Sequence, residues 1–497
     1  MTGGDWMATR ETDVSTGKIG FIERHGLYND EQKDAAQKVE AEIREKGLRQ
    51  IRISWGDQHG IARGKTLTVD AFSAALRNGK DFQSAVLIMD TTNNIIVPLF
   101  VPGGGFGIPE MTGYPDTILV PDPTTFRVLP WAQRTGWVLA DMYFSSGSPV
   151  PFSTRQILRN QVQRLSQAGY DYVAGLEVEF YITKLEDPKL TAEQSGWPPD
   201  PPSVSTIAHG FQYLTENRNA EIDPILQLLT DNLEAVGLPV RSIEDEWGPG
   251  QTEFTFAPVA GVEAADNMLL FRTATKQICR QNGYHATFMS RPALPNFFSS
   301  GWHLHQSLYR TGTDDNAFVA GEDGPVPLSR LGQQFAAGIL AHAAAASVFT
   351  TPTINGYKRF QPNSFAPNRI NWAYENRGAC VRLIGGPDDP TTHLENRAGE
   401  PAANPYMYMA SQIVSGMDGI QNEMEPPPLS DAPYTDDYPA LPGSLTEAVA
   451  ALKDSRLFRE KFGDAFVDYI LMVKDSEIRR FNSHVTDWEH REYFEVF

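Results

Sequence analysis

Apolar residues follow two different periods along the chain, and the change of period separates an N-terminal helix from a strand-rich segment. Between residues 30 and 47, Val39 and Ile43 lie four apart in a polar stretch that stops at Gly47, as in an amphipathic helix. From residue 48 to 145, short β-branched or alternating runs (IRISWGD, GKTLTV, SAVLIMD, IIVPLF) are separated by Gly, Asn and Asp. We therefore expect an N-terminal extension and helix over 1–47 and a small β-rich domain over 48–145.

A larger α+β domain is predicted over residues 146–497. The linker-like segment SSGSPVPF is followed by STRQILRNQVQRLSQAGYD, a helical pattern with a Ser/Thr start and a stop at Gly169. Further helical patterns over 224–237, 264–283 and 329–348 alternate with short strands. An antiparallel sheet with helices packed against it is the expected architecture.

Composition and charge limit the classes of binding partner and the cellular compartment that we expect. Of 497 residues, 42 are Lys or Arg and 62 are Asp or Glu, so the net charge of −20 disfavours nucleic acid and anionic membranes as partners. The N-terminus lacks the apolar core of a signal peptide, and the longest apolar stretch, 335–349, is too short to span a membrane. The two cysteines, Cys279 and Cys380, fit a reducing compartment, so we expect a cytoplasmic protein.

Four glutamates lie in two segments whose local geometry would gather carboxylates. In GLEVEFYIT, Glu177 and Glu179 are two apart in a strand-like run, which puts both on one face. In EDEWGPGQTEF, Glu246 and Glu253 bracket a Gly-Pro-Gly turn that would return both acids to the same place. A solvent-facing strand edge and a turn with incidental acids are the alternative interpretations.

Imidazole and guanidinium groups complete a second set of candidate residues. GWHLHQS places His303 and His305 on one strand face, where they would bind a metal or an anion unless they are purely structural. Four of the five arginines in the 39 residues from 359 to 397 are candidates, because their planar forks suit carboxylate or phosphate unless they are ordinary surface residues. They are Arg359, Arg377, Arg382 and Arg397, with Glu395 beside the last. Acids for a divalent metal and arginines for phosphate are what ATP-driven carboxylate activation requires.

Six segments in this order resemble the motifs of the glutamine synthetase family: GLEVEFYIT, EWGPGQTE, SSGWHLHQS, INGYKRFQP, ENRGACVRL and ENRAGEPAANPY. The resemblance covers residues 48–497 and includes PDTILVPDPTTFRVLPW and LPGSLTEAVAAL. It implies a small N-terminal β-grasp domain, a larger catalytic domain, and a homo-oligomer of stacked hexameric rings with active sites between neighbouring subunits.

The resemblance also implies roles for residues at matching positions. One metal, Mg²⁺ or Mn²⁺, would be held by Glu179, Glu246 and Glu253, and a second, which bridges the ATP phosphates, by Glu177, His303 and Glu395. L-glutamate would contact Arg359, Arg397 and Gly301, and ATP would contact His305, Ser307, Arg377 and Arg382. The catalytic residues would be Arg377, Arg397 and His303. The implied chemistry is phosphorylation of the glutamate γ-carboxylate, followed by attack of an amine on γ-glutamyl phosphate.

The chain departs from the family pattern where that pattern handles ammonium. Phe365 stands where glutamine synthetases have a glutamate that closes the site, and Phe298 where they have an asparagine. Gln83 falls, in a loose alignment, near an ammonium-binding aspartate, while Asp116 matches a second acidic position. An unpaired cation is costly in an apolar pocket, whereas phenyl rings favour a hydrophobic or aromatic amine. Simple loop repacking is the alternative for the two phenylalanines.

We therefore predict an amine pocket formed by Phe298, Phe365, Gln83 and Trp302. An arylamine is neutral near pH 7 and needs no carboxylate to deprotonate it. The predicted enzyme is an ATP-dependent ligase that joins the γ-carboxylate of L-glutamate to a hydrophobic, aromatic amine such as aniline. The alternatives are an ordinary glutamine synthetase that uses ammonia and a family relative without activity.

Overall fold

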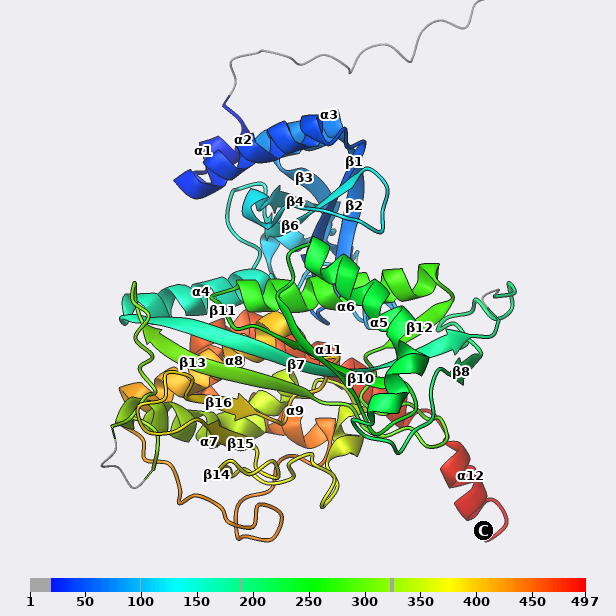
Figure 1. Ribbon diagram of the computed structural model, residues 1–497. Helices are drawn as coiled ribbons and strands as arrows, with labels where there is room; N and C mark the ends of the chain where they lie inside the picture. Colours follow the sequence, from blue (N-terminus) through cyan, green and yellow to red (C-terminus); the bar gives the residue numbers. More distant parts are fainter. Residues whose placement is uncertain (1–18, 99, 188–189, 322–325) are drawn as a thin grey trace, which may run out of the picture.

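The computed structural model describes residues 19–98, 100–187, 190–321 and 326–497, and Figure 1 shows a small domain above a larger one. The small domain is built on a six-stranded sheet of order β2-β1-β6-β4-β3, with β5 paired to β6. Strand β1 is antiparallel to β2 and parallel to β6. The strands are β1 (Gln50–Gly56), β2 (Ala62–Thr68), β3 (Lys80–Gln83), β4 (Asp116–Pro121), β5 (Arg127–Val128) and β6 (Thr135–Tyr143).

The predicted N-terminal helix is present as α2 (Asp30–Glu45), between α1 (Phe21–Arg24) and α3 (Val69–Asn78). The Asn29 side chain caps α2 in a capping box with Gln32. Val39 and Ile43 are buried in the same core as the strands of the small domain, so α2 covers this sheet. Residues 1–18 of the predicted extension lie outside the described part of the chain.

Two of the runs predicted as strands adopt other structures. Residues 84–88 of SAVLIMD form a 3₁₀ helix, η1 (Ser84–Ile88), and 95–100 contribute only an isolated bridge from Ile95 to Met89 within the described residues. The Asp90 carboxylate accepts the backbone N–H groups of Thr92 and Asn94, both at 2.9 Å, and holds a tight turn between the two runs. The turn chemistry therefore prevails over the β-branched composition.

The large domain is organised around one long strand, β7 (Tyr170–Leu185), in a ten-stranded sheet. The main path is β14-β15-β16-β13-β7-β10-β9, and β8, β11 and β12 also pair with β7. Apart from the parallel β14–β15 pair, these pairings are antiparallel, as predicted. The strands are β8 (Val204–Thr206), β9 (Val240–Asp245), β10 (Gln251–Phe256), β11 (Val259–Ala260), β12 (Tyr284–Thr287), β13 (Trp302–Arg310), β14 (Trp372–Tyr374), β15 (Val381–Ile384) and β16 (His393–Asn396).

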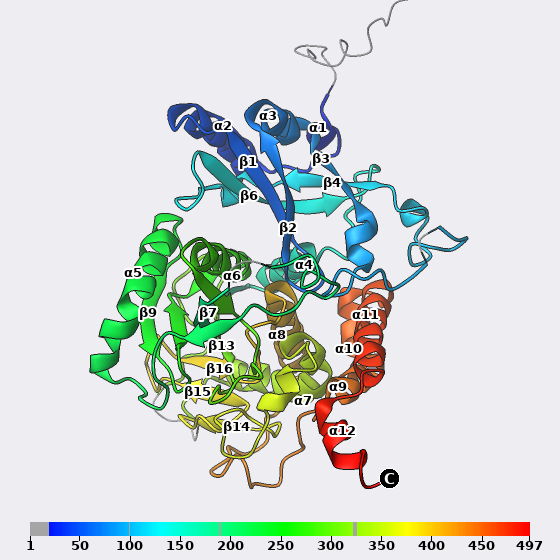
Figure 2. The ribbon, with the colours of Figure 1, turned by 90° about the vertical axis from the view of Figure 1, so that its right-hand side faces the viewer.

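Helices pack on one face of this sheet, as Figures 1 and 2 show. The predicted helices are present as α4, α5, α6 and α7, although α5 begins earlier than expected and contains Pro224. The helices are α4 (Thr154–Gln167), α5 (Asn219–Ala235), α6 (Glu263–Gln281), α7 (Arg330–Thr350), α8 (Pro405–Gln421), α9 (Leu445–Lys453), α10 (Arg456–Phe462), α11 (Asp464–Asn482) and α12 (Asp487–Tyr493). Within the described residues, no helix is both long and apolar enough to cross a membrane.

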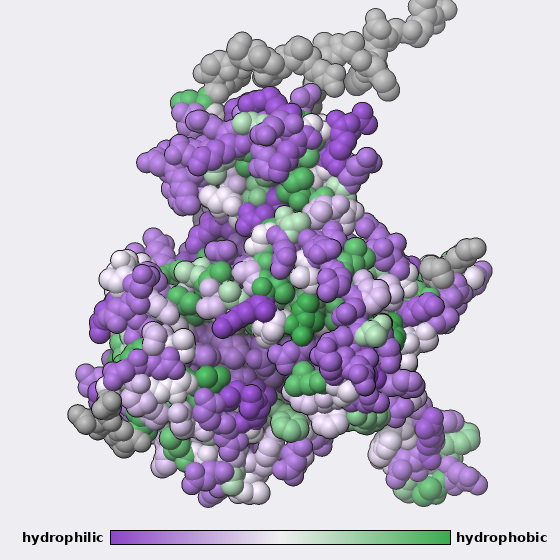
Figure 3. Space-filling model, viewed as in Figure 1, coloured by the Kyte–Doolittle hydropathy of each residue, from purple (hydrophilic) through white to green (hydrophobic). Residues whose placement is uncertain are grey.

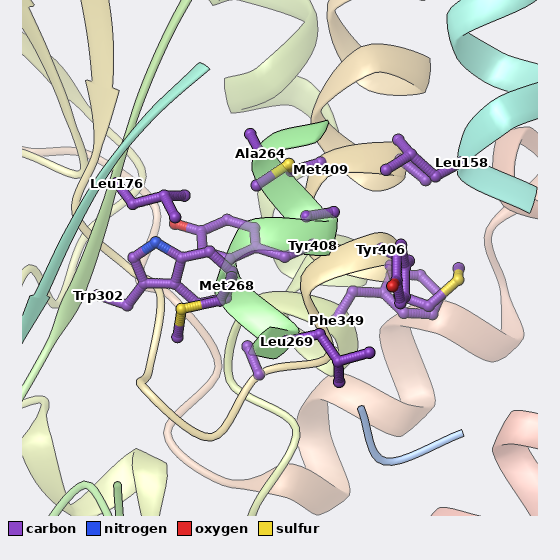
Figure 4. Packing of buried hydrophobic residues seen from close by; sticks show 14 of the residues in the cluster. Leu158, Leu176, Ala264, Met268, Leu269, Trp302, Phe349, Tyr406, Tyr408 and Met409 are labelled. Carbon is purple, nitrogen blue, oxygen red and sulfur yellow. The ribbon is translucent and has the colours of Figure 1, made fainter. Parts of the chain in front are cut away.

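The packing of β13 against the helices determines which of its two faces remains available for a binding site. Trp302 and Leu304 are fully buried, and Trp302 packs edge-on against Tyr408 of α8, with ring centroids 4.9 Å apart. Figure 4 shows this packing, with Met268 of α6 and Leu176 of β7 nearby. Because side chains alternate along a strand, His303 and His305 point to the opposite face of the sheet.

Candidate active site

The strand register brings the predicted acids and histidines together on the sheet face away from the helices. His303 lies opposite Glu177 in the β13–β7 pair, and Glu179 lies opposite Glu253 in the β7–β10 pair. On the other side, Glu395 of β16 lies opposite His305. Directly paired residues share a face of a sheet, so one surface carries all of these groups.

Three overlapping clusters of ligand atoms result. In each cluster one atom per residue lies within 4.8 Å of the others. The clusters are Glu177, His303 and Glu395; Glu179, Glu253 and His303; and Glu244, Glu246 and Glu253. Glu244 is the member that sequence reasoning missed, although its spacing of two from Glu246 is the same signal that marked Glu177 and Glu179.

The Gly-Pro-Gly turn returns the chain as expected. The Glu246 backbone N–H donates to the Gln251 carbonyl at 3.0 Å, which closes the turn between β9 and β10. Gly250 has a φ of 80°, and a Cβ there would lie 2.5 Å from the Ile182 carbonyl oxygen, so only glycine fits. The turn thereby places Glu246 beside Glu253.

The carboxyl groups nearest this turn resist ionisation, because they are buried close to one another. Burial, together with the charges of Glu177, Glu179 and Glu246, raises the pKa of Glu253 to about 10. Burial and the neighbouring Glu179 raise the pKa of Glu246 to about 8. Buried carboxyls that repel one another are the donor set that a hard divalent cation neutralises, so these residues fit Mg²⁺ or Mn²⁺.

The acidic side chains on this sheet face form a row. At the end of the row that holds Glu177 and Glu395, basic side chains offset the negative charge of the carboxylates. Burial opposes ionisation of Glu177, but the charge and hydrogen bond of His303 outweigh it and lower the Glu177 pKa. The imidazole Nδ1 of His303 lies 2.5 Å from Glu177 Oε1, and His305 Nε2 lies 3.0 Å from Glu177 Oε2. Glu395 is fully buried, and its pKa is lowered chiefly by Arg397 against the opposing effect of burial.

The predicted arginines occupy different positions around this row. Arg382 Nη1 donates to Glu395 at 3.2 Å, and Arg397 also donates to Glu395. Arg359 is 2% exposed and donates to the backbone carbonyls of residues 397–399. Arg377 is exposed in the turn between β14 and β15.

Gly301 lies close against two of these groups. A Cβ at Gly301 would lie 2.9 Å from Arg359 Nη2 and 3.0 Å from His303 Nε2. A side chain here would displace the guanidinium or the imidazole, so glycine lets both groups approach this strand end. The predicted glutamate-binding residues Gly301 and Arg359 are thus neighbours. Arg397 is close to them, because the Arg359 guanidinium donates to the Arg397 carbonyl.

A cavity of about 630 Å³ adjoins the row on the His305 side. This volume lies in the range of small-molecule sites. Figure 3 shows hydrophilic residues around a hollow in the large domain. Of the predicted ATP contacts, His305 and Ser307 line the cavity together with Glu177, whereas Arg382 lies on β15 between Glu375 and Glu395.

The four predicted amine-pocket residues lie in different environments. Phe298 and Phe365 are 38% and 63% exposed in loops of the large domain. Trp302 points into the helix-packed core, because strand alternation places it opposite to His303. Gln83 ends β3 in the small domain, where it pairs with Asp116 of β4 (Figure 1).

Comparison with known proteins establishes the family. The model of the glutamine synthetase catalytic domain matches residues 151–493. The chain belongs to the glutamine synthetase family. It is 47% identical to gamma-glutamylanilide synthase from an Acinetobacter species, over 96% of this chain and 99% of that protein. It is 29% identical to glutamate–isopropylamine ligase from a Pseudomonas species, over 94% of this chain and 100% of that protein.

A solved structure agrees on the fold. The structure titled "GmaS/ADP complex-Conformation 1" matches with a TM-score of 0.77 and 24% identity, over 92% of this chain and 99% of that chain. The predicted α+β fold with a glutamine-synthetase-like catalytic domain is confirmed. The chain is a carbon–nitrogen ligase of this family, as its sequence predicted.

Proposed function

We propose that this protein uses ATP to join the γ-carboxylate of L-glutamate to a hydrophobic aromatic amine such as aniline. The observation that carries the proposal is the single sheet face that holds the acidic clusters and His303, with Arg382 and Arg397 bonded to Glu395 on that face. The 47% identity to a gamma-glutamylanilide synthase supports the aromatic acceptor. The phenylalanines at 298 and 365, where ammonia-using relatives carry polar or acidic groups, support it independently.

The activation half of the reaction is assigned to the sheet face. Glu179, Glu246 and Glu253 would hold one divalent cation, and Glu177, His303 and Glu395 a second. When bound, these cations would neutralise the phosphate oxygens during transfer. A γ-carboxylate oxygen attacks the γ-phosphorus of ATP, and ADP leaves.

In this scheme, arginine side chains of the protein contact the substrates. Arg359, next to Gly301, would pair with the glutamate carboxylate, helped by Arg397. Arg377 and Arg382 would stabilise the phosphates, with ATP seated in the cavity lined by His305 and Ser307. A guanidinium fork matches both carboxylate and phosphate oxygens, which supports this division.

The transfer half ends with attack of the amine on γ-glutamyl phosphate. The nitrogen lone pair bonds to the γ-carbon, the carbon–oxygen bond to phosphate breaks, and the nitrogen loses one proton. An arylamine enters this step neutral, so an apolar site costs it little desolvation. Ammonium would need anionic partners that Phe298 and Phe365 do not provide.

We further propose a homo-oligomer of stacked hexameric rings in which the small domain of a neighbour completes each site. Gln83 and Asp116 lie in the small domain, apart from the catalytic face of their own chain (Figure 1). The projecting α12 has no buried residue, and Trp488, Phe494 and Phe497 are exposed at this end of the chain. Exposed aromatic residues in such a segment favour burial against another subunit.

The mass of the particle tests the assembly. Light scattering on full-length protein is expected to give a ring-sized oligomer, and deletion of residues 484–497 is expected to reduce its size. A monomeric full-length protein would contradict the proposal. The two cysteines are free and buried, which supports a reducing, cytoplasmic compartment; cell fractionation checks this.

One assay tests the proposed reaction. ADP release is measured at fixed ATP and L-glutamate with aniline, ethylamine or ammonium, with Mg²⁺ or Mn²⁺ in turn. We expect release with aniline and γ-glutamylanilide as the product. Equal or better use of ammonium would identify a divergent glutamine synthetase, and no release with any amine would identify a relative without activity.

A further inference from the structure

Four aromatic side chains gather at one edge of the catalytic face. The sequence motifs do not account for them as a group. Phe211 and Phe298 meet edge-on, with ring centroids 5.4 Å apart and planes at 85°. Tyr213 and Trp247 are stacked, with centroids 5.7 Å apart and planes at 10°. All four are exposed, although large aromatic residues usually are not. We call these four residues the aromatic wall.

Backbone hydrogen bonds hold the wall in place. The loop between β8 and α5 carries Phe211, whose backbone N–H donates to the Trp247 carbonyl at 2.8 Å. The Phe298 N–H donates to the Tyr181 hydroxyl at 2.7 Å. Phe211 has a φ of 65°, a conformation that non-glycine residues rarely adopt and that persists where surrounding contacts hold it. The backbone positions from which Phe211 and Phe298 project are therefore fixed by these contacts.

The wall borders the carboxylates assigned to the substrate-side cation. Trp247 directly follows Glu246, and its backbone N–H donates to the Glu246 carboxylate at 3.3 Å. Tyr213 stacks on Trp247, so its ring lies beside the same turn.

A short chain of hydrogen bonds leads from Phe298 to the same carboxylates. Tyr181, which accepts from Phe298, donates to Gln251 Oε1 at 3.2 Å. Gln251 Nε2 in turn donates to Glu179 at 3.2 Å. The wall is thus tied both to the Glu246 turn and to Glu179, the two sides of the substrate-side acidic cluster.

We propose that the aromatic wall binds the ring of the acceptor amine and sets the preference for aromatic over small amines. This inference rests on the proposed ligase function and names the residues that select its acceptor. One edge-on pair and one stacked pair offer both ring edges and ring faces, the two geometries in which aromatic rings associate best. The bound ring covers the exposed aromatic surface, while the amino group lies toward the carboxylate cluster, where the activated γ-carbon is expected.

Substitutions in the wall test this inference through selectivity. Phe211→Ala and Trp247→Ala remove a ring, and Phe211→Leu keeps apolar volume without a ring. For each variant kcat/KM is measured with aniline and with ammonium at saturating ATP and glutamate. We expect the aniline-to-ammonium ratio to fall about tenfold in both alanine variants, and by less in Phe211→Leu. Phe481→Ala, an exposed phenylalanine at the end of α11, is the matched control and should keep the native ratio.

The outcomes separate the two proposals. If the native enzyme does not use aniline, the proposed function fails before the variants are considered. If it does, an unchanged ratio in both alanine variants overturns the assignment of the wall. A smaller oligomer in light scattering, with the selectivity ratio retained, would make the wall a subunit contact and would also overturn it.

Discussion

Glu253 offers the sharpest physical test of the acidic cluster, because its carboxyl is buried beside three others. We consider Glu253→Gln, which keeps the shape and the hydrogen-bonding capacity of the side chain but removes its titration. The Glu253 pKa is raised from 4.5 to about 10 in the folded protein by burial and by Glu177, Glu179 and Glu246. In metal-free protein near neutral pH, this carboxyl is therefore protonated.

The raised pKa of Glu253 determines the direction in which the free energy of unfolding changes with pH. Between the unfolded pKa of 4.5 and the folded pKa of about 10, the folded state holds a proton that the unfolded state has released. The free energy of unfolding then falls by about 1.4 kcal/mol for each pH unit gained. Stability from this proton is full below pH 4.5 and is lost as the pH rises toward 10. From pH 6 to pH 8, wild type should lose about 3 kcal/mol relative to Glu253→Gln.

Urea denaturation of EDTA-treated protein, at one protein concentration, measures this difference at pH 6, 7 and 8. Glu234→Gln, which removes an exposed carboxylate on α5, is the matched control and should show no such trend. Added Mg²⁺ should flatten the wild-type trend, because a cation replaces the proton. A wild-type-minus-variant difference that is independent of pH, or that grows with pH, would refute the charge crowding on which the cation site rests.

Three further substitutions test individual roles. Glu179→Ala removes an oxygen ligand and should abolish ADP release while the particle keeps its mass; near wild-type rates would contradict the metal assignment. Arg359→Lys replaces a fork by a point charge and should raise the glutamate KM about tenfold or more in steady-state assays, whereas an unchanged KM would move the carboxylate site elsewhere. Phe365→Glu should lower kcat/KM for aniline about 100-fold and increase glutamine formation from ammonium; retention of full aniline activity would separate Phe365 from the acceptor pocket.

The regular elements could be predicted where local signals agree with the tertiary structure. The amphipathic spacing of Val39 and Ile43, the Asn29 cap and the Gly47 stop all point to the same helix, and α2 follows them. In SAVLIMD the β-branched and apolar residues indicate a strand, but three consecutive buried side chains, Val86, Leu87 and Ile88, need a turn of 3₁₀ helix to enter the core. Propensity alone carries no information about which side the core lies on.

The catalytic face could be predicted because it depends on strand geometry. A spacing of two places Glu177 with Glu179 and His303 with His305, and antiparallel register then joins the two pairs. The same rule also excludes Trp302 from that face, since it is one residue from His303. The sequence prediction puts Trp302 in the amine pocket, whereas strand alternation places its indole in the core against Tyr408.

The acceptor side depends on loops, and this limits what a sequence can reveal about it. Phe211 and Trp247 are 36 positions apart in the sequence. They meet because the β8–α5 loop, in which Phe211 and Leu214 are left-handed, makes two backbone hydrogen bonds, to the carbonyls of residues 245 and 247. No period or spacing encodes such a contact. If the sheet holds the groups that activate glutamate, as proposed, and the loop rings bind the acceptor, loop substitutions alone would change the acceptor and leave the carboxylates of the sheet intact. Relatives of this family are named for different amines, one for an anilide product and another for an isopropylamine substrate.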